Sequence, residues 1–312
     1  MLIWLGWRLA AVACVLLLIG GGAALAQEKV QFLSLDDNGA GQPGTMIDGY
    51  LFRPKGNAPR PAVVLLHGCW SLFDGNGRIE KLERAWARRL NASGYVVLLV
   101  DSYTTRGIKE MCSPDSFQLP IFEKRPKDAY GALRYLQAQS FVQPDRIAAM
   151  GWFAGGGAIL LAVGNDRDRP PVPAQGDFKA AVLMYPSLCD DQYYKAPWIK
   201  SDKVIWTTKV PLLILDGGED VWAPAGPCRT FADGAVARGS SIEMKIYPNA
   251  YHSFDVPNLP TIKLPAYREP DGVVPVIGTN APARKDALRR VPAFLARYLG
   301  KDGRATGTPS PR

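Results

Sequence analysis

Residues 147–157 decide the fold, because an apolar run passes directly into a glycine-rich turn. The stretch reads Ile147-Ala148-Ala149-Met150-Gly151-Trp152-Phe153-Ala154-Gly155-Gly156-Gly157. A short continuous apolar run of this kind is typical of a strand that is covered on both faces of a sheet. Because ligands of open α/β sheets bind at the carboxyl ends of strands, the turn around Phe153 is a candidate site.

Similar apolar runs recur on both sides of this stretch and alternate with helical patterns. Besides Ile147–Trp152, strands are expected over Ile47–Arg53 (at a sheet edge), Ala62–Leu66, Tyr95–Val100, Ala180–Tyr185, Leu212–Leu215 and Ile242–Tyr247. Apolar residues at helical spacing predict helices over Arg78–Ser93, Pro126–Gln139 and Arg284–Leu299. This alternation predicts an α/β fold with a mostly parallel central sheet and helices on both faces. Residues 27–300 are expected to form a single domain, followed by a disordered tail at 301–312.

Composition excludes several classes of protein. The chain has 312 residues, of which 47% are hydrophobic, and a formal charge of +8. Its Lys and Arg residues are scattered, which argues against a nucleic-acid groove. With two histidines and five cysteines it is poorly equipped for a metal cluster, so neither a metal nor another cofactor is expected.

The first 26 residues have the pattern of a signal peptide. Arg8 precedes an apolar run that ends in Ala24-Leu25-Ala26, a small-x-small cleavage pattern. A retained membrane anchor and a lipoprotein modified at Cys14 are the alternatives. Cleavage after Ala26 predicts an exported protein, periplasmic or secreted, that is not held at the membrane.

Three further strand ends carry unusual residues. His67-Gly68-Cys69-Trp70 follows the strand at 62–66, and Gly217-Gly218-Glu219-Asp220 follows the strand at 212–215. The last strand is followed by Asn249-Ala250-Tyr251-His252-Ser253-Phe254-Asp255.

With these residues in place, the chain resembles the dienelactone hydrolase family, a branch of the α/β-hydrolases. The resemblance covers about residues 49–299. Its carriers are the His67-Gly68-Cys69 turn, Asp101-Ser102-Tyr103 with Arg106-Gly107, Pro144-Asp145-Arg146-Ile147, Tyr185-Pro186, Gly217–Asp220 with Trp222-Ala223-Pro224, and Tyr247-Pro248 with Tyr251–Asp255.

The resemblance implies an α/β-hydrolase fold and hydrolysis of small carboxylic esters or lactones. In that family a Ser or Cys on a strand-to-helix elbow attacks the carbonyl group, and an acid and a histidine assist it. Carried over, Asp220 would be the acid and His252 the base. The oxyanion donors would be the N–H of Ala154 and one from Cys69 or Trp70.

The sequence departs from the family at the decisive position, where Phe153 replaces the nucleophile. A phenyl ring has no nucleophilic atom, and neither Trp152 nor Ala154 supplies one. Cys69 and Ser71 are near the site but are not on an elbow. Three hypotheses follow: a hydrolase by lineage whose activity is lost or residual, a non-catalytic exported binding protein with the same pocket, or an acyl transferase, which would need the same nucleophile.

Other residues near the strand ends have less specific roles. Arg106 and Trp222 are the candidate substrate-binding residues. Arg106 would bind a substrate carboxylate or form a surface salt bridge, and Trp222 would line the pocket or pack in the core. His67 is expected to orient the backbone of its turn rather than to transfer protons. The oligomeric state stays open.

Four cysteines remain after loss of the signal peptide. If the sheet has the strand order of the family, loops from neighbouring strand ends meet, and the pairs Cys69–Cys112 and Cys189–Cys228 are expected. Export would place these cysteines in an oxidising compartment, where disulfides persist.

Overall fold

The computed structural model describes residues 27–36, 42–165, 169–195 and 206–300. The expected signal peptide and the expected C-terminal tail lie outside the described residues. Within the described ranges, no helix is both long enough and apolar enough to cross a membrane.

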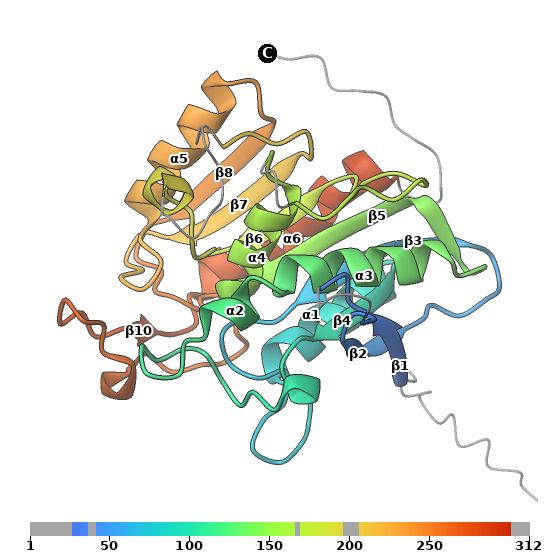
Figure 1. The fold of residues 1–312 in the computed structure, drawn as a ribbon. Coiled ribbons are helices and arrows are strands. Elements are labelled where there is room, and N and C mark those ends of the chain that lie inside the picture. Colours follow the sequence, from blue (N-terminus) through green and yellow to red (C-terminus); the bar gives the residue numbers. More distant parts are fainter. Residues whose placement is uncertain (1–26, 37–41, 166–168, 196–205, 301–312) are drawn as a thin grey trace, which may run out of the picture.

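An eight-stranded sheet forms the centre of the protein (Figure 1). Its strands are β1 (Gln27–Leu33), β2 (Met46–Phe52), β3 (Arg60–Leu66), β4 (Val96–Asp101), β5 (Val142–Trp152), β6 (Ala181–Met184), β7 (Leu212–Gly217) and β8 (Ile242–Tyr247). Their order is β1-β2-β4-β3-β5-β6-β7-β8. The β1–β2 and β2–β4 pairs are antiparallel and the others are parallel. The predicted α/β-hydrolase fold with a mostly parallel sheet is therefore confirmed.

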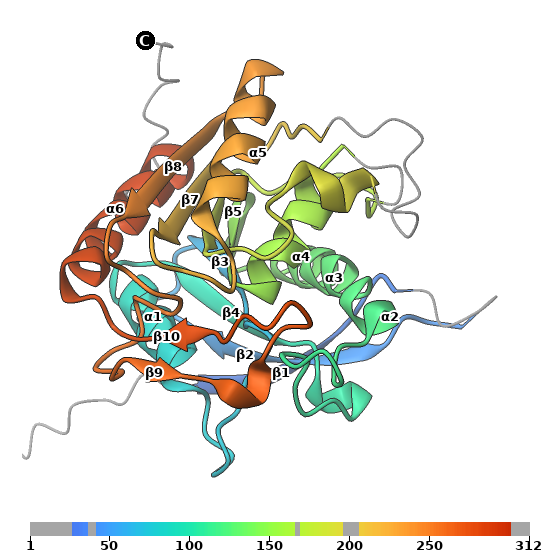
Figure 2. The ribbon, with the colours of Figure 1, turned by 90° about the vertical axis from the view of Figure 1, so that its left-hand side faces the viewer.

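Helices cover both faces of this sheet, as Figure 2 shows. Helices α1 (Lys81–Ala92) and α6 (Ala281–Leu299) lie on one face, and α3 (Arg125–Gln137), α4 (Ala154–Val163) and α5 (Ala225–Ala237) lie on the other. A short helix α2 (Leu119–Phe122) precedes α3. Strands β9 (Ile262–Lys263) and β10 (Val276–Ile277) form a small separate sheet.

The alternation of side chains along β3 explains why both faces need cover. Val63 and Leu65 pack into the apolar cluster that contains Trp86 of α1. Val64 and Leu66 belong to the opposite cluster, which is built with α3 and α4. Because all of these β3 side chains are fully buried, each contributes about 1.5–3 kcal/mol of hydrophobic stabilisation.

The expectation that residues 47–53 form an edge strand is wrong, because β1 lies outside β2 and pairs with it from Gln27↔Phe52 to Leu33↔Met46. Only Val30 and Phe32 of β1 are buried. Two buried side chains among polar ones give too weak a pattern to identify this strand from the sequence.

Both expected disulfides are present, and each joins loops from neighbouring strand ends. Cys69, after β3, is bonded to Cys112, which follows β4. Cys189, after β6, is bonded to Cys228 in α5, which follows β7. The strand order thus brings together the four cysteines that the resemblance paired.

Replacing Cys189 and Cys228 together by alanine should lower the free energy of unfolding by about 3–4 kcal/mol, since the bond closes a long loop in the unfolded chain. The two cysteines are 39 residues apart. Urea unfolding of oxidised wild type and of the double variant measures the difference, with dithiothreitol-treated wild type as the reference for loss of both bonds. Equal midpoints for the oxidised wild type and the variant would contradict the prediction.

Candidate active site

A sharp strand-to-helix turn lies at the end of β5. Phe153 is the single residue between β5 and α4, and its φ of 45° and ψ of −111° are rare for an L-residue. A Cβ on Gly151 would lie 2.6 Å from the carbonyl carbon of Gly155, and a Cβ on Gly155 would lie 2.2 Å from the oxygen of Leu66. The glycine pair therefore permits the geometry of a nucleophile elbow, which holds its central side chain above the sheet.

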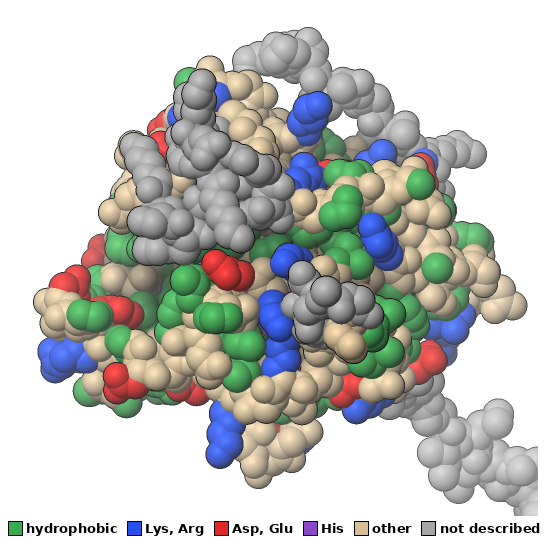
Figure 3. Space-filling model, in the orientation of Figure 1, with side chains coloured by type: hydrophobic (Ala, Val, Ile, Leu, Met, Phe, Trp, Pro, Cys, Tyr) green, Lys and Arg blue, Asp and Glu red, His purple; other side chains and the backbone are tan. Residues whose placement is uncertain are grey.

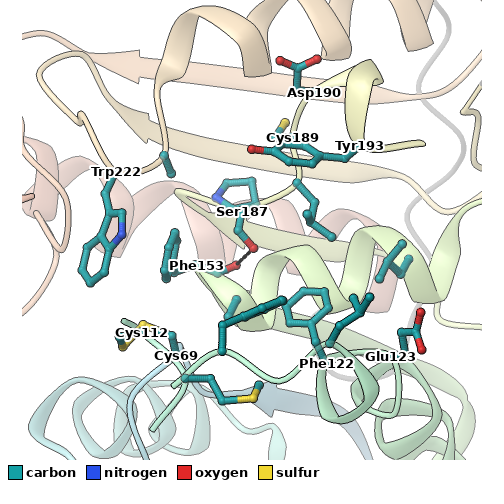
Figure 4. Close-up of a pocket in the computed structure, with 18 of the residues that line it drawn as sticks. Cys69, Cys112, Phe122, Glu123, Phe153, Ser187, Cys189, Asp190, Tyr193 and Trp222 are labelled. Carbon is teal, nitrogen blue, oxygen red and sulfur yellow. Dashed lines mark hydrogen bonds between the residues drawn. A yellow bond between two sulfur atoms is a disulfide. The ribbon is translucent and has the colours of Figure 1, made fainter. Parts of the chain in front are cut away.

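The Phe153 ring fills the place where an elbow presents its reactive atom. It lies edge-on to the His252 imidazole, with 4.8 Å between ring centroids, and 4.9 Å from the Trp222 ring. Figure 4 shows Phe153 beside Trp222, at one end of a pocket. The elbow thus holds an apolar group against the histidine.

The histidine and its acid form a close pair. His252 Nδ1 lies 2.7 Å from Asp220 Oδ2, and both side chains are buried. The other carboxylate oxygen of Asp220 accepts hydrogen bonds from the backbone N–H groups of Trp222 (2.8 Å) and Ala223 (2.9 Å). Asp220 is thereby fixed where it can orient the imidazole, which is what the acid of a Ser-His-Asp triad does.

The turn after β3 borders the same pocket. His67 Nδ1 lies 3.0 Å from the Gly68 oxygen and 2.9 Å from the Trp70 oxygen. Burial, with the nearby Arg125 charge, holds the pKa of His67 well below its usual value. The neutral ring therefore donates from Nδ1 to the turn, in line with its expected orienting role. Figure 4 places Cys69 opposite Phe153.

The oxyanion donors stay a prediction. The N–H of Ala154 is in the first turn of α4, where helical N–H groups have no partner within the helix. Cys69 and Trp70 directly follow the His67-Gly68 pair, and the Cys69 carbonyl accepts a hydrogen bond from Met111.

Arg106 does not face the pocket, so its assignment as a substrate-binding residue is corrected. Its two terminal nitrogens each lie 2.8 Å from an oxygen of Asp128, and Nη2 also lies 3.0 Å from Asp36 Oδ2. The Arg106 side chain is only 6% exposed, and both carboxylates are fully buried. The guanidinium is thus taken up by a buried ion-pair cluster rather than by a surface salt bridge.

The pocket beside the elbow has a volume of about 880 Å³, which is ample for a drug-sized ligand. Trp222 lines it, as expected, together with Phe153, Ala154 and Cys69. His252 is not among the described residues that line it. Since the Phe153 ring packs on the imidazole, we infer that this ring separates the base from the pocket.

A buried carboxylate behind the site was not foreseen from the sequence. Asp255 accepts hydrogen bonds from the indole N–H of Trp86 (2.7 Å), the indole N–H of Trp152 (3.1 Å) and the hydroxyl of Tyr185 (2.8 Å). Trp152 immediately precedes Phe153, and the Tyr185 ring lies 4.4 Å from the His252 ring. Asp255 therefore joins the elbow strand, β6 and the histidine loop.

Replacing Asp255 by leucine should cost about 2–4 kcal/mol of unfolding free energy, because three buried donors lose their acceptor. Asparagine should cost about 1 kcal/mol or less. Burial raises the pKa of Asp255, so the charged form carries a desolvation penalty that a neutral amide avoids. Denaturant unfolding measures the loss for the Asp255→Leu and Asp255→Asn variants. Asp286→Leu is the control, because it removes a carboxylate near the surface that accepts the hydrogen bond of the Tyr247 hydroxyl. Equal losses for the Leu and Asn variants at position 255 would contradict this account.

The elbow residue Phe153, the acid Asp220 and the histidine His252 follow one another in the nucleophile–acid–base chain order of the α/β-hydrolases. A model of the Dienelactone hydrolase family matches residues 47–299, and the chain belongs to that family.

Individual relatives agree with this assignment, and a solved structure agrees with the fold. The chain is 26% identical, over 226 residues, to the "Probable 2-oxo-3-(5-oxofuran-2-ylidene)propanoate lactonase" of Bradyrhizobium sp; these residues cover 71% of this chain and 84% of that one. It is 30% identical over 141 residues to the quorum-quenching protein AidA of Acinetobacter baumannii, covering 44% and 43% of the two chains. Thermogutta terrifontis esterase 2, in a structure phosphorylated by paraoxon, superposes with a TM-score of 0.59 at 18% identity over 89% of this chain and 96% of its own. At that identity the likeness supports the fold alone.

Proposed function

We propose that the chain is an exported, dienelactone hydrolase-like protein that retains the apparatus for hydrolysing small carboxylic esters or lactones but lacks its nucleophile. Activity is then lost or residual. The observation that carries the proposal is Phe153 at a glycine-framed elbow, packed against a histidine that is hydrogen-bonded to Asp220. The lactonase name of the Bradyrhizobium relative supports the ester or lactone class.

Export is part of the proposal. It rests on the signal-peptide pattern at residues 1–26 and is consistent with two disulfides, which persist outside reducing compartments.

Ester turnover by wild type, beside the Phe153→Ser variant, tests the proposal. Hydrolysis by the variant that depends on His252 supports it. Robust His252-dependent turnover by wild type would show that a different residue acts as nucleophile.

A non-catalytic binding protein is the second candidate, and one observation favours it. The pocket remains open although Phe153 occupies the reactive position, and the ring forms part of its wall. Ligand binding without turnover, in wild type and in a folded Phe153→Ser variant alike, would favour this function over the first.

A further inference from the structure

Several charged side chains that line the pocket form ion pairs or hydrogen bonds with other residues of the protein. Arg169 pairs with Asp177 and donates to the Tyr130 hydroxyl. Glu269 accepts the indole N–H of Trp222 at 2.8 Å. These two charged pocket residues therefore both have partners within the protein.

The other charged side chains of the described lining, Glu123, Lys127 and Asp190, together carry a net negative charge. Asp190 accepts the backbone and side-chain N–H groups of Gln192 at 2.9 and 3.1 Å. Glu123 and Lys127 have opposite charges and stand four residues apart where α3 begins. With Arg169 neutralised by Asp177, acidic residues outnumber basic ones among the described residues of this lining.

A second and independent observation concerns Arg106, the residue that the sequence suggested as an anchor for a substrate carboxylate. Arg106 is held by Asp36 and Asp128 and is buried away from the pocket lining. Freeing it would leave the buried Asp128 without its cation and Asp36 with Lys124 alone, a change that costs about 3–5 kcal/mol. A ligand carboxylate would have to supply more than this.

Most of the remaining described lining is apolar, and it extends to the surface. Apolar side chains such as Met111, Phe122 and Leu161 line the pocket. Phe117 and Tyr193, also in the lining, are 48% and 37% exposed. Figure 3 shows apolar side chains gathered over the region of α2 and α4 on this face. Exposed apolar groups of this size that continue into a cavity are typical of a ligand site.

Two covalent bonds hold opposite walls of this cavity. The Cys69–Cys112 disulfide lies on one side and Cys189, bonded to Cys228, on the other (Figure 4). A wall fixed in this way loses little conformational entropy when a ligand binds. This favours affinity for an apolar ligand that forms few hydrogen bonds.

We infer that the pocket binds an uncharged, elongated molecule with a long alkyl or aryl part. If this ligand is also the substrate, the inference rests on the proposed function. The substrate would then be an ester or lactone without a free carboxylate. Its hydrocarbon part would extend from the elbow toward Phe117.

Calorimetry on the wild-type protein tests this inference without any catalysis. The probes are decanol, decanoate and decyltrimethylammonium, which share one chain and differ in the charge of the head group, each used below its aggregation concentration. Decanol should bind best, with decanoate at least about tenfold weaker. Equal or tighter binding of decanoate, tightest binding of the ammonium compound, or no binding of decanol would each overturn the inference.

Variants locate the binding site. Leu161→Trp fills the pocket and should weaken decanol binding by at least about tenfold. Phe117→Asp acts at an exposed position and should weaken it severalfold. Val236→Trp is the matched control, because Val236 is exposed and does not line the pocket. Unchanged binding in both pocket variants, with folding verified by thermal melting, would overturn the inference.

Turnover by Phe153→Ser separates this inference from the proposed function. If that variant is inert while wild type binds decanol as described, the hydrolase proposal fails and the ligand class stands. If it hydrolyses acetyl and decanoyl esters with equal kcat/KM, the hydrolase proposal stands and the ligand class fails.

Discussion

Replacing Phe153 by serine or cysteine is expected to give hydrolysis of activated esters that depends on His252 and Asp220, whereas wild type should be no faster than its own His252→Ala variant. Loss of a triad nucleophile can reduce kcat about 10⁶-fold, and misplacement of a reacting group by ~1 Å costs about 100-fold. A gain of roughly 10²–10⁴ over wild type is therefore expected, because a side chain introduced where a phenyl ring stood will not be optimally placed.

Burst kinetics with an activated ester provide the measurement, since acyl-enzyme formation gives a fast first turnover. Phe153→Ala is the matched control. It uncovers His252 without adding a nucleophile, so any turnover that it gains belongs to water activated by the histidine. A Ser variant no faster than the Ala variant would contradict nucleophilic catalysis at this elbow.

Replacing Arg106 by methionine is expected to cost about 3–5 kcal/mol of unfolding free energy, because Asp128 stays buried without its cation and Asp36 keeps only Lys124, at 3.6 Å. Denaturant unfolding measures this loss. Arg289→Met is the control: its partner is Asp286, but the Arg289 side chain is 71% exposed. An exposed pair of this kind contributes about 1 kcal/mol or less. Similar losses of unfolding free energy in the two variants would show that the buried Arg106 cluster stabilises the protein no more than an exposed ion pair does.

The same cluster predicts a pH dependence. Burial alone would raise the pKa of Asp36, but hydrogen bonds from Thr45 and Arg106 outweigh it and lower the pKa from 3.8 to about 2. The folded state therefore binds protons less readily than the unfolded chain, and the stabilisation is present above about pH 4. It is lost as the pH falls through 2. The stability difference between wild type and Arg106→Met should shrink over that interval.

The parts of the fold that the sequence predicted are those with strong local patterns. Strands β3, β4, β6 and β7 and the second half of β5 are built on short apolar runs, and the order of the strands along the chain indicated the places of Phe153, Asp220 and His252. Strand β1 was missed because only two of its side chains are buried.

Interactions between distant segments were not predictable in this way. Asp255 has its donors 70, 103 and 169 residues away, in α1, in β5 and directly after β6. Arg106 likewise has one partner 22 residues away and another 70 residues away. Nothing in the local sequence around a charged residue shows which distant residues the folded chain will place beside it.

The backbone conformation at Phe153 has a consequence for how the nucleophile position can evolve. A non-glycine residue at positive φ costs of the order of 1–3 kcal/mol, and here the glycine pair and the flanking strand and helix maintain that conformation whatever side chain stands in the middle. Phenylalanine codons differ from serine and cysteine codons by a single nucleotide. A point mutation in the gene can therefore add or remove the nucleophile without any rearrangement of the elbow, so that gain and loss of chemistry at this position are each a single genetic step.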